Sequence, residues 1–375
     1  MKYVLIIILF FSLLQLDAQK RFEIDGQFSV IGSYSPDNDF DVFGAIRYIP
    51  ELNYFIPIDS VRKIDFEASV NIFGSLLFHP FDTLQHDGKI SPYRGWVRYS
   101  GKRLQVRLGL QKIDFGQGML LRPIQWFNQI DPRDPLQQTN GVYGGLVKYD
   151  FKNNANVWFW TLYGNDKRRG FDVFSTSFDS PEIGARFQFP VKRGEIGLSY
   201  NYRNASGKDL FMIPGYEHIP ENRIGIDAKW DVVVGLWTEI SHVHKSIDVG
   251  DFTNQTIVNL GTDYTFGIGN GLNVVAEHLL LTYDQTPLKY SNVTNMSATT
   301  LSYPLGFFDN LSAIFYYNWT SETATFLLNY SHQFKRLTGY VMAYYNPKTQ
   351  VAVQQNEFVN TFSGPGLRVM VVYNH

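Results

Sequence analysis

Polar and apolar residues alternate along most of this chain, in segments of about ten residues each. In residues 103–111 the even-numbered positions are all Leu or Val, whereas the odd-numbered positions are Arg, Gln or Gly. Successive side chains of a strand point to opposite faces of a sheet. Each segment therefore predicts a strand with one apolar and one polar face.

The alternating segments follow one another along nearly the whole sequence. They begin near Arg21, Val42, Lys63, Tyr93, Arg103, Val142, Ala155, Glu182, Glu195, Arg223, Val234, Thr256, Leu272, Asn295, Leu311, Thr323, Arg336 and Gly366. Two of them are interpreted as hairpins within loops. The pattern thus predicts an all-β fold, a single transmembrane antiparallel β-barrel of about 16 strands, with about 14–18 as the range and even numbers favoured.

Turn residues divide the segments into short and long connections. Short turns are predicted at Gly101-Lys102, 152–154, 192–194, 269–271 and Lys335-Arg336. Longer connections are predicted at 81–90, 114–140, 165–180, 206–221, 284–292 and 348–364. We expect the short turns on the periplasmic side and the long connections outside, as in outer-membrane barrels.

A soluble β-sandwich also alternates, with its apolar faces turned to a core between two sheets. Sandwich strands are shorter and such domains are smaller. Many apolar faces here also end in aromatic residues, as at Tyr200, Phe187 and Tyr264, which is typical of the girdle at a membrane interface. The barrel is therefore the favoured fold.

The N-terminus carries the features of an export signal. Lys2 is followed by an apolar run over residues 4–14, and Leu16-Asp17-Ala18 then leads to a cleavage point before Gln19. The run is short for a membrane-spanning helix, and no second long apolar run follows it. We predict a signal peptide at residues 1–18 and one barrel domain at residues 19–375.

The composition fits this interpretation. Aromatic residues make up 16% of the chain and charged residues 18%. The net charge of −2 argues against nucleic acid as a partner. The chain has no cysteine, which excludes disulfides, thiolate metal sites, thiol catalysis and a lipoprotein anchor.

The connection at residues 114–140 holds the most distinctive chemistry. Two Asp-Pro steps place Asp131 and Asp134 in extended or turn conformations, where Arg122 and Arg133 can bridge to them. One hypothesis is a constriction folded into the lumen, in which these four residues and Trp126 select solutes. The alternative is a rigid surface loop stapled by Asp/Arg pairs and capped by Trp126 and Phe127.

This region resembles a pattern of porin-like outer-membrane β-barrel families of Gram-negative bacteria. Their R-x-G-x-Q strand corresponds to residues 107–111, and it is followed by a glycine-bearing turn and a D-P-x-D-P-like stretch at residues 131–135. Those families often have Trp-Gly where this chain has Phe115-Gly116. The resemblance implies a porin-like channel and does not identify a solute.

The polar strand faces are predicted to line the lumen, with charges of both signs. The residues predicted to face it are Asp65, Glu67, Arg103, Arg107, Glu182, Arg186, Arg203, Arg223, Asp227, Lys229, Asp263, Glu277 and Arg368. Such a mixture predicts a hydrated channel with transverse fields, although opposite charges on neighbouring strands can also simply pair.

Catalytic and metal-binding patterns are weak. His242 and His244 share a strand face at a spacing that can chelate a metal, but no third ligand is evident. Ser331 and His332 are adjacent and so face opposite sides of a strand, although the Asn329–His332 stretch is distantly similar to the Asn/His/Ser chemistry of outer-membrane phospholipases. We expect no cofactor, no metal and no enzymatic activity.

The sequence thus predicts a bacterial outer-membrane channel for passive diffusion of small hydrophilic solutes, with membrane lipids as partners and with further copies of the chain or envelope proteins as candidate partners. Two alternatives stay open. One is a non-conducting barrel that serves as scaffold or partner in an envelope assembly. The other is a barrel lipid hydrolase.

Overall fold

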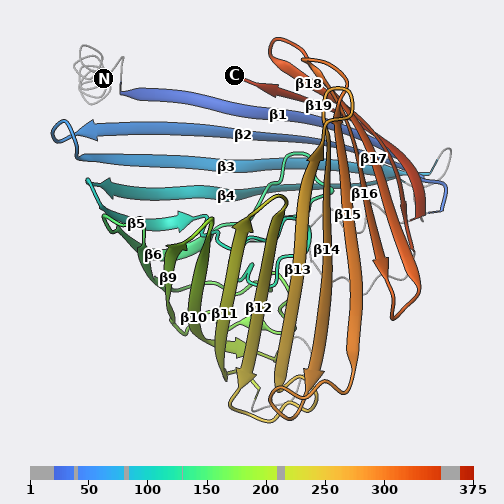
Figure 1. Cartoon of the computed structure of the whole chain (residues 1–375). Coiled ribbons are helices and arrows are strands. Elements are labelled where there is room, and N and C mark those ends of the chain that lie inside the picture. The colour runs from blue at the N-terminus through green and yellow to red at the C-terminus, as the bar shows by residue number, and fades with distance from the viewer. Residues whose placement is uncertain (1–20, 38–40, 80–83, 129, 209–215, 348–363) are drawn as a thin grey trace.

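The chain folds into a single antiparallel sheet that closes on itself. The computed structural model describes residues 21–37, 41–79, 84–128, 130–208, 216–347 and 364–375. The sheet closes because β1 (Phe22–Tyr34) pairs with β2 (Val42–Pro57) on one side and with β19 (Gly364–Asn374) on the other. Figure 1 shows these strands side by side, with the strands of the opposite wall crossing them in the view.

The other strands follow in chain order. They are β3 (Lys63–Phe78), β4 (Leu84–Ser100), β5 (Leu104–Gln111), β6 (Val142–Asp150), β7 (Asn156–Leu162), β8 (Ser175–Thr176), β9 (Glu182–Val191), β10 (Gly194–Ser206), β11 (Ile219–Asp231), β12 (Gly235–Lys245), β13 (Asn254–Phe266), β14 (Leu272–Asp284), β15 (Val293–Pro304), β16 (Asp309–Asn318), β17 (Thr323–Gln333) and β18 (Leu337–Asn346).

The barrel wall contains 18 strands, two more than the sequence-based estimate of about 16, though within its range. The two segments interpreted as loop hairpins are wall strands, because each of them has hydrogen-bonded neighbours on both sides. The short strand β8 stands outside this count, since it pairs only with β10 and lies within the connection between β7 and β9.

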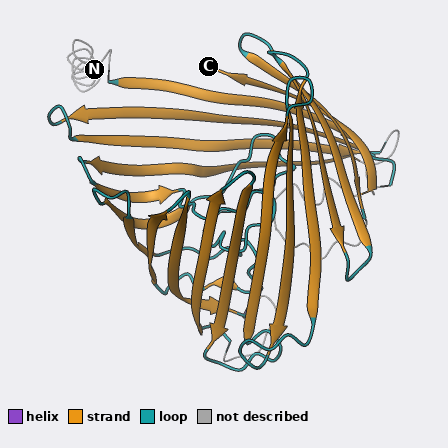
Figure 2. Cartoon of the chain, viewed as in Figure 1, coloured by secondary structure: helices purple, strands orange, loops and turns teal. Residues whose placement is uncertain are grey.

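The connections differ between the two ends of the barrel, as Figure 2 shows. The five predicted short turns all lie at the end where β1 starts and β19 finishes, which we call the turn end. The long connections lie at the opposite end. The predicted connection at residues 81–90 was too long, because β4 already begins at Leu84, opposite Phe78 of β3. Most of residues 348–364 and the predicted signal peptide lie outside the described residues.

The outer face of the wall is apolar, as the alternation predicts. Leu108, Phe159, Ile224 and Leu260 all point outward and are exposed by more than half. Aromatic pairs such as Phe187 and Phe189 lie on the same face, with ring centroids 5.6 Å apart. This face provides the surface that a hydrocarbon environment requires.

Within the described residues, no helix is long and apolar enough to cross a membrane.

The inner face differs from the expected uniformly polar lining. Between β14 and β19 its central positions are apolar and buried, as for Leu279, Ile314, Met342 and Met370. They belong to the same hydrophobic cluster as Leu121 of the connection between β5 and β6. An interior with such a cluster is packed in part, rather than filled with water throughout.

Candidate functional site

Residues 112–141, which connect β5 to β6, are folded inside the barrel, and we call them the inward segment. Figure 1 shows this connection within the wall rather than above it. It leaves β5, reaches β12–β14 on the far side of the lumen, and returns to β6. The return path passes the first strands, because the Gln138 amide donates to the Gln27 side chain at 2.8 Å and Gln138 also accepts from Arg47.

Two buried glutamates of the far wall hold the inward segment. Glu277 on β14 accepts three backbone N–H groups from residues 119–121, at distances of 2.5–3.1 Å. Glu239 on β12 accepts from the backbone N–H groups of Gln117, Gly118 and Ile124, of which the bond from Gly118 measures 2.6 Å. Hydrogen bonds from N–H groups to a carboxylate are strong, so these contacts hold the segment across the lumen.

An aromatic cluster packs the other side of the inward segment against β6 and β7. Phe115, Trp126 and Phe127 are all less than 9% exposed, and Phe115 stacks on Trp160 with ring centroids 5.7 Å apart. The Trp126 indole N–H donates to Ser241 at 3.2 Å. Trp126, predicted to contact solutes, thus lies in the packed core of the segment in this structure.

The predicted Asp/Arg bridges form only in part. Arg133 binds both carboxylate oxygens of Asp131 at 2.9 Å. Arg122 instead pairs with Asp114 at 2.7 Å, so the sequence assigned it the wrong partner. Although burial raises the pKa of Asp114, Arg122 and Lys112 hold it below its ordinary value. Asp134 accepts the Leu136 N–H at 3.0 Å, and burial raises its pKa.

Charged residues of β9–β12 and of the connection before β9 form a compensated network. Arg186 binds both oxygens of Asp227, and each of the two side chains is 1% exposed. The arginine on β9 reaches this aspartate on β11 by crossing β10 at Gly197, where a Cβ atom would lie 2.2 Å from the guanidinium. Glycine at position 197 is therefore what lets the pair form.

The rest of the network follows the same principle. Arg203 and Arg223 both bind Glu221 and Asp172 at 2.6–2.9 Å, and Lys245 lies 3.7 Å from Glu221. Arg169 of the connection before β9 binds Glu182 at 2.7 Å. All these charges are buried and paired with one another, so removing one partner would leave a buried charge without a counter-charge.

The other residues predicted to face the lumen are dispersed. Arg368 is buried and donates to Ser33 at 2.7 Å. Lys229 and Asp263 lie partly buried near the turn end. Arg103 precedes β5 and borders a pocket on the outside of the turns, next to Arg62.

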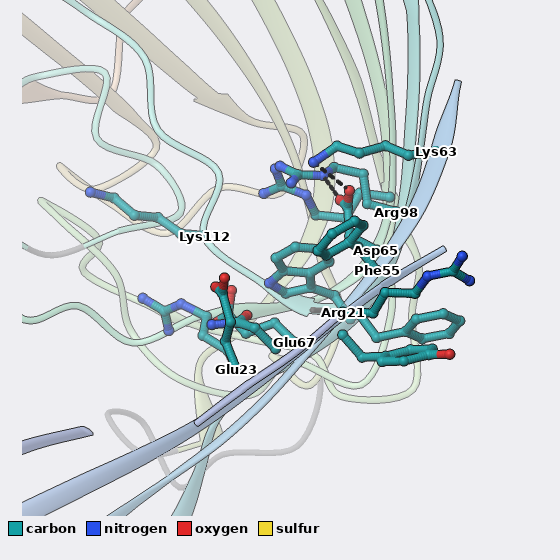
Figure 3. A pocket seen from close by; sticks show the side chains of 14 residues that line it. Arg21, Glu23, Phe55, Lys63, Asp65, Glu67, Arg98 and Lys112 are labelled. Carbon is teal, nitrogen blue, oxygen red and sulfur yellow. Dashed lines mark hydrogen bonds and ion pairs between the residues drawn. The ribbon is translucent and has the colours of Figure 1, made fainter. Parts of the chain in front are cut away.

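The remaining predicted residues, Asp65, Glu67 and Arg107, line an open cavity of 430 Å³ at the turn end of β1–β5. Figure 3 shows the cavity and eight of its side chains by name. The charged residues that line it are Arg21, Glu23, Lys63, Asp65, Glu67, Arg94, Arg98, Arg107 and Lys112. Here charged side chains meet open space.

Sequence reasoning missed three features of the site. Glu239 lies on the inward face of β12 with Trp237 and Ser241, opposite the apolar row of residues 234–240. Arg94 and Glu23 lie within the predicted segments that begin near Tyr93 and Arg21, but they were not assigned to the lumen. The alternation of these two segments could have placed both residues on the inner face.

Within the described residues, the structure adds no third ligand to the His242/His244 pair and no catalytic partner to Ser331. Among the described residues, no group of three or more His, Asp or Glu side chains is placed to hold a metal ion. His242 and His244 contact Thr256 and Asn254 of β13 at 2.9 and 2.7 Å. His332 contacts Asp309 at 2.7 Å, and Ser331 alternates to the other face of β17.

The sequence matches no protein-family model and no curated protein. Its fold is similar to those of solved barrels at low identity. OccK5 (OpdH) of Pseudomonas aeruginosa has a TM-score of 0.57 at 11% identity, covering 95% of this chain and 98% of that one. OccAB1 of Acinetobacter baumannii has 0.57 at 10%, covering 95% and 96%. Salmonella typhi OmpF, solved with daunomycin, has 0.51 at 8%, covering 94% and 97%. The chain therefore has the closed-barrel fold of porins.

Proposed function

We propose that this protein is an outer-membrane channel that lets small hydrophilic solutes diffuse through a narrow passage. The observation that carries the proposal is the position of the inward segment. It contacts the wall at β6, β7 and β12–β19, and through Gln138 and Thr139 also at β1, β2 and β4, while the turn end of β1–β5 retains a charged cavity of 430 Å³. A solute that crosses the barrel would pass through this cavity.

The similarity to OmpF and to the Occ channels supports this function, since those barrels have the same fold. The apolar outer wall supports a location in a lipid bilayer, and for an exported bacterial chain that bilayer is the outer membrane. We propose that the five loop residues predicted to select solutes instead keep the inward segment rigid, because their described contacts lie within the segment or with the wall. These residues are Arg122, Trp126, Asp131, Arg133 and Asp134.

A second candidate function is a non-conducting barrel that serves as a scaffold. The dry cluster of Leu121 with the inner face of β14–β19 favours it, since a fully packed lumen would block solutes. The two candidates differ in one measurable property, which is conductance.

The test is single-channel recording of the refolded full chain in planar bilayers, over a series of salt concentrations and with reversed ion gradients. The channel predicts stable open steps, smaller than those of wide general porins because the inward segment narrows the lumen. Gel mobility before and after heating verifies folding. A folded, inserted barrel that stays silent at all voltages would refute the channel and support the scaffold.

A further inference from the structure

Acidic and basic side chains both line the turn-end cavity, and two of the carboxylates lie together. Figure 3 shows Glu23 and Glu67 close together, away from the group of Lys63, Asp65 and Arg98. The register explains their proximity, because Glu23 of β1 and Glu67 of β3 both lie opposite Asn53 of β2. The β1–β3 side of the cavity therefore presents two neighbouring carboxylates.

The β4–β5 side presents cations. Arg98 and Arg107 lie directly opposite one another, and each guanidinium lies 4.8 Å from the centroid of the Trp96 ring. Trp96 is in turn the cross-strand neighbour of Glu67. One indole thus stands at the boundary between the acidic and the basic side and holds both guanidinium groups by cation–π contact.

Part of this charge is already compensated. Asp65 pairs with Lys63 at 2.9 Å and also with Arg98, and Lys112 pairs with Asp114 at 3.1 Å. These side chains can hold one another without a solute.

Five of the charged side chains that line the cavity form no ion pair of 4.0 Å or less among the described residues, namely Arg21, Glu23, Glu67, Arg94 and Arg107. Glu67 interacts with Arg94 and Arg107 at longer range, so these charges are compensated only in part. Arg94 donates only to neutral oxygens of Tyr93 and Thr139. The Nε atom of Arg107 is buried and has no hydrogen-bond partner there. The Nε atom of Arg186 on β9 also lacks a partner, so it is the open cavity beside Arg107 that makes its guanidinium a candidate for a ligand contact.

We propose that this cavity binds a small zwitterion, such as a free amino acid or a short peptide. Its carboxylate would contact Arg107 and Arg94, and its ammonium group would contact Glu67 and Glu23. A simple anion would meet the two carboxylates, and a neutral solute would leave both sides unpaired. The volume of 430 Å³ lies within the usual range of small-ligand sites. The proposal rests on the channel function, because it names the solute class that the passage would favour.

The test measures binding directly, by titration calorimetry with the refolded full chain in nanodiscs. The probes are unblocked alanyl-alanine, its N-acetylated form, its C-terminal amide, and glucose. We expect the unblocked dipeptide to bind, and each blocked form to bind about tenfold more weakly, since each loses one charge-assisted contact of about 1.4 kcal/mol.

Two variants test which side of the cavity contacts each end of the dipeptide. Arg107→Gln should weaken the unblocked dipeptide about tenfold and abolish the difference between it and the amide. Glu67→Gln should do the same for the acetylated form. Arg103→Gln is the matched control, because Arg103 lies outside the cavity at the turns, and it should bind like the wild type.

Other outcomes would overturn the proposal in distinguishable ways. Tighter binding of the acetylated form would identify an anion site, and equal binding of glucose would show that charge has no role. Conductance is recorded in parallel. Open steps without dipeptide binding would refute the zwitterion site and keep the channel, whereas binding without open steps would refute the channel and keep the site.

Discussion

Two regions of the lumen wall contain the same charged residue types but arrange them differently. On β9–β12, Arg186 and its carboxylate partner are 1% exposed and bind one another through two hydrogen bonds. At the turn end of β1–β5, Arg107 is only half-buried, faces a cavity and forms no ion pair of 4.0 Å or less among the described residues, although Glu67 and Asp65 act on it at longer range. We therefore expect an arginine of the inner face to be available to solutes only where no neighbouring strand supplies a counter-charge.

The largest expected effect comes from removing one partner of an ion pair in the β9–β12 network. Arg186→Ala leaves Asp227 buried without its counter-charge, which costs about 3–5 kcal/mol of folding free energy. Urea titration of the barrel in lipid vesicles measures this loss. Arg107→Ala is the matched control, and we expect it to change stability by about 0.5 kcal/mol or less. Equal losses for both variants would contradict the distinction between the two regions.

A second, smaller effect on the protein concerns the inward segment, which lies in the lumen between these two regions. Glu277→Gln removes the charge that accepts three backbone N–H groups, but the amide oxygen of Gln can still accept, so these bonds are weakened rather than lost. We expect a loosened segment and a conductance that rises several-fold, with larger open-channel noise. Single-channel recording checks this.

Asp263→Asn serves as its control. Asp263 is also an acidic residue of the inner face, on neighbouring β13, and among the described residues no contact joins it to the inward segment. If the two variants conduct alike, the change in Glu277→Gln comes from lost charge and not from release of the segment.

The fold was largely predictable, because alternation is a local property of the sequence. Each alternating segment is a wall strand, and each of the five short turns lies at one end. The number of wall strands, 18, was underestimated, because nothing in a single segment distinguishes a wall strand from a hairpin in a loop.

The site was less predictable, because its contacts depend on register and on loop path. Arg186 finds its partner two strands away across Gly197, which only the pairing of β9, β10 and β11 determines. Arg122 was expected near the Asp-Pro steps but lies at Asp114, because the inward segment doubles back within the lumen. In the sequence the charged positions of both regions look alike, and only the neighbouring strands determine which of them are paired.

The smallest effect tests the cavity by ion selectivity alone. Arg107→Gln removes one positive charge beside open space, where water screens it, so stability should stay within about 0.5 kcal/mol of the wild type. Because the acidic side with Glu67 is then less opposed, the reversal potential under a salt gradient should shift toward cation selectivity, and most clearly at low salt. Glu67→Gln should shift it the other way. Opposite shifts of similar size would place both residues on the ion pathway, whereas unchanged reversal potentials would mean that ions cross the barrel elsewhere and that the cavity is a side pocket.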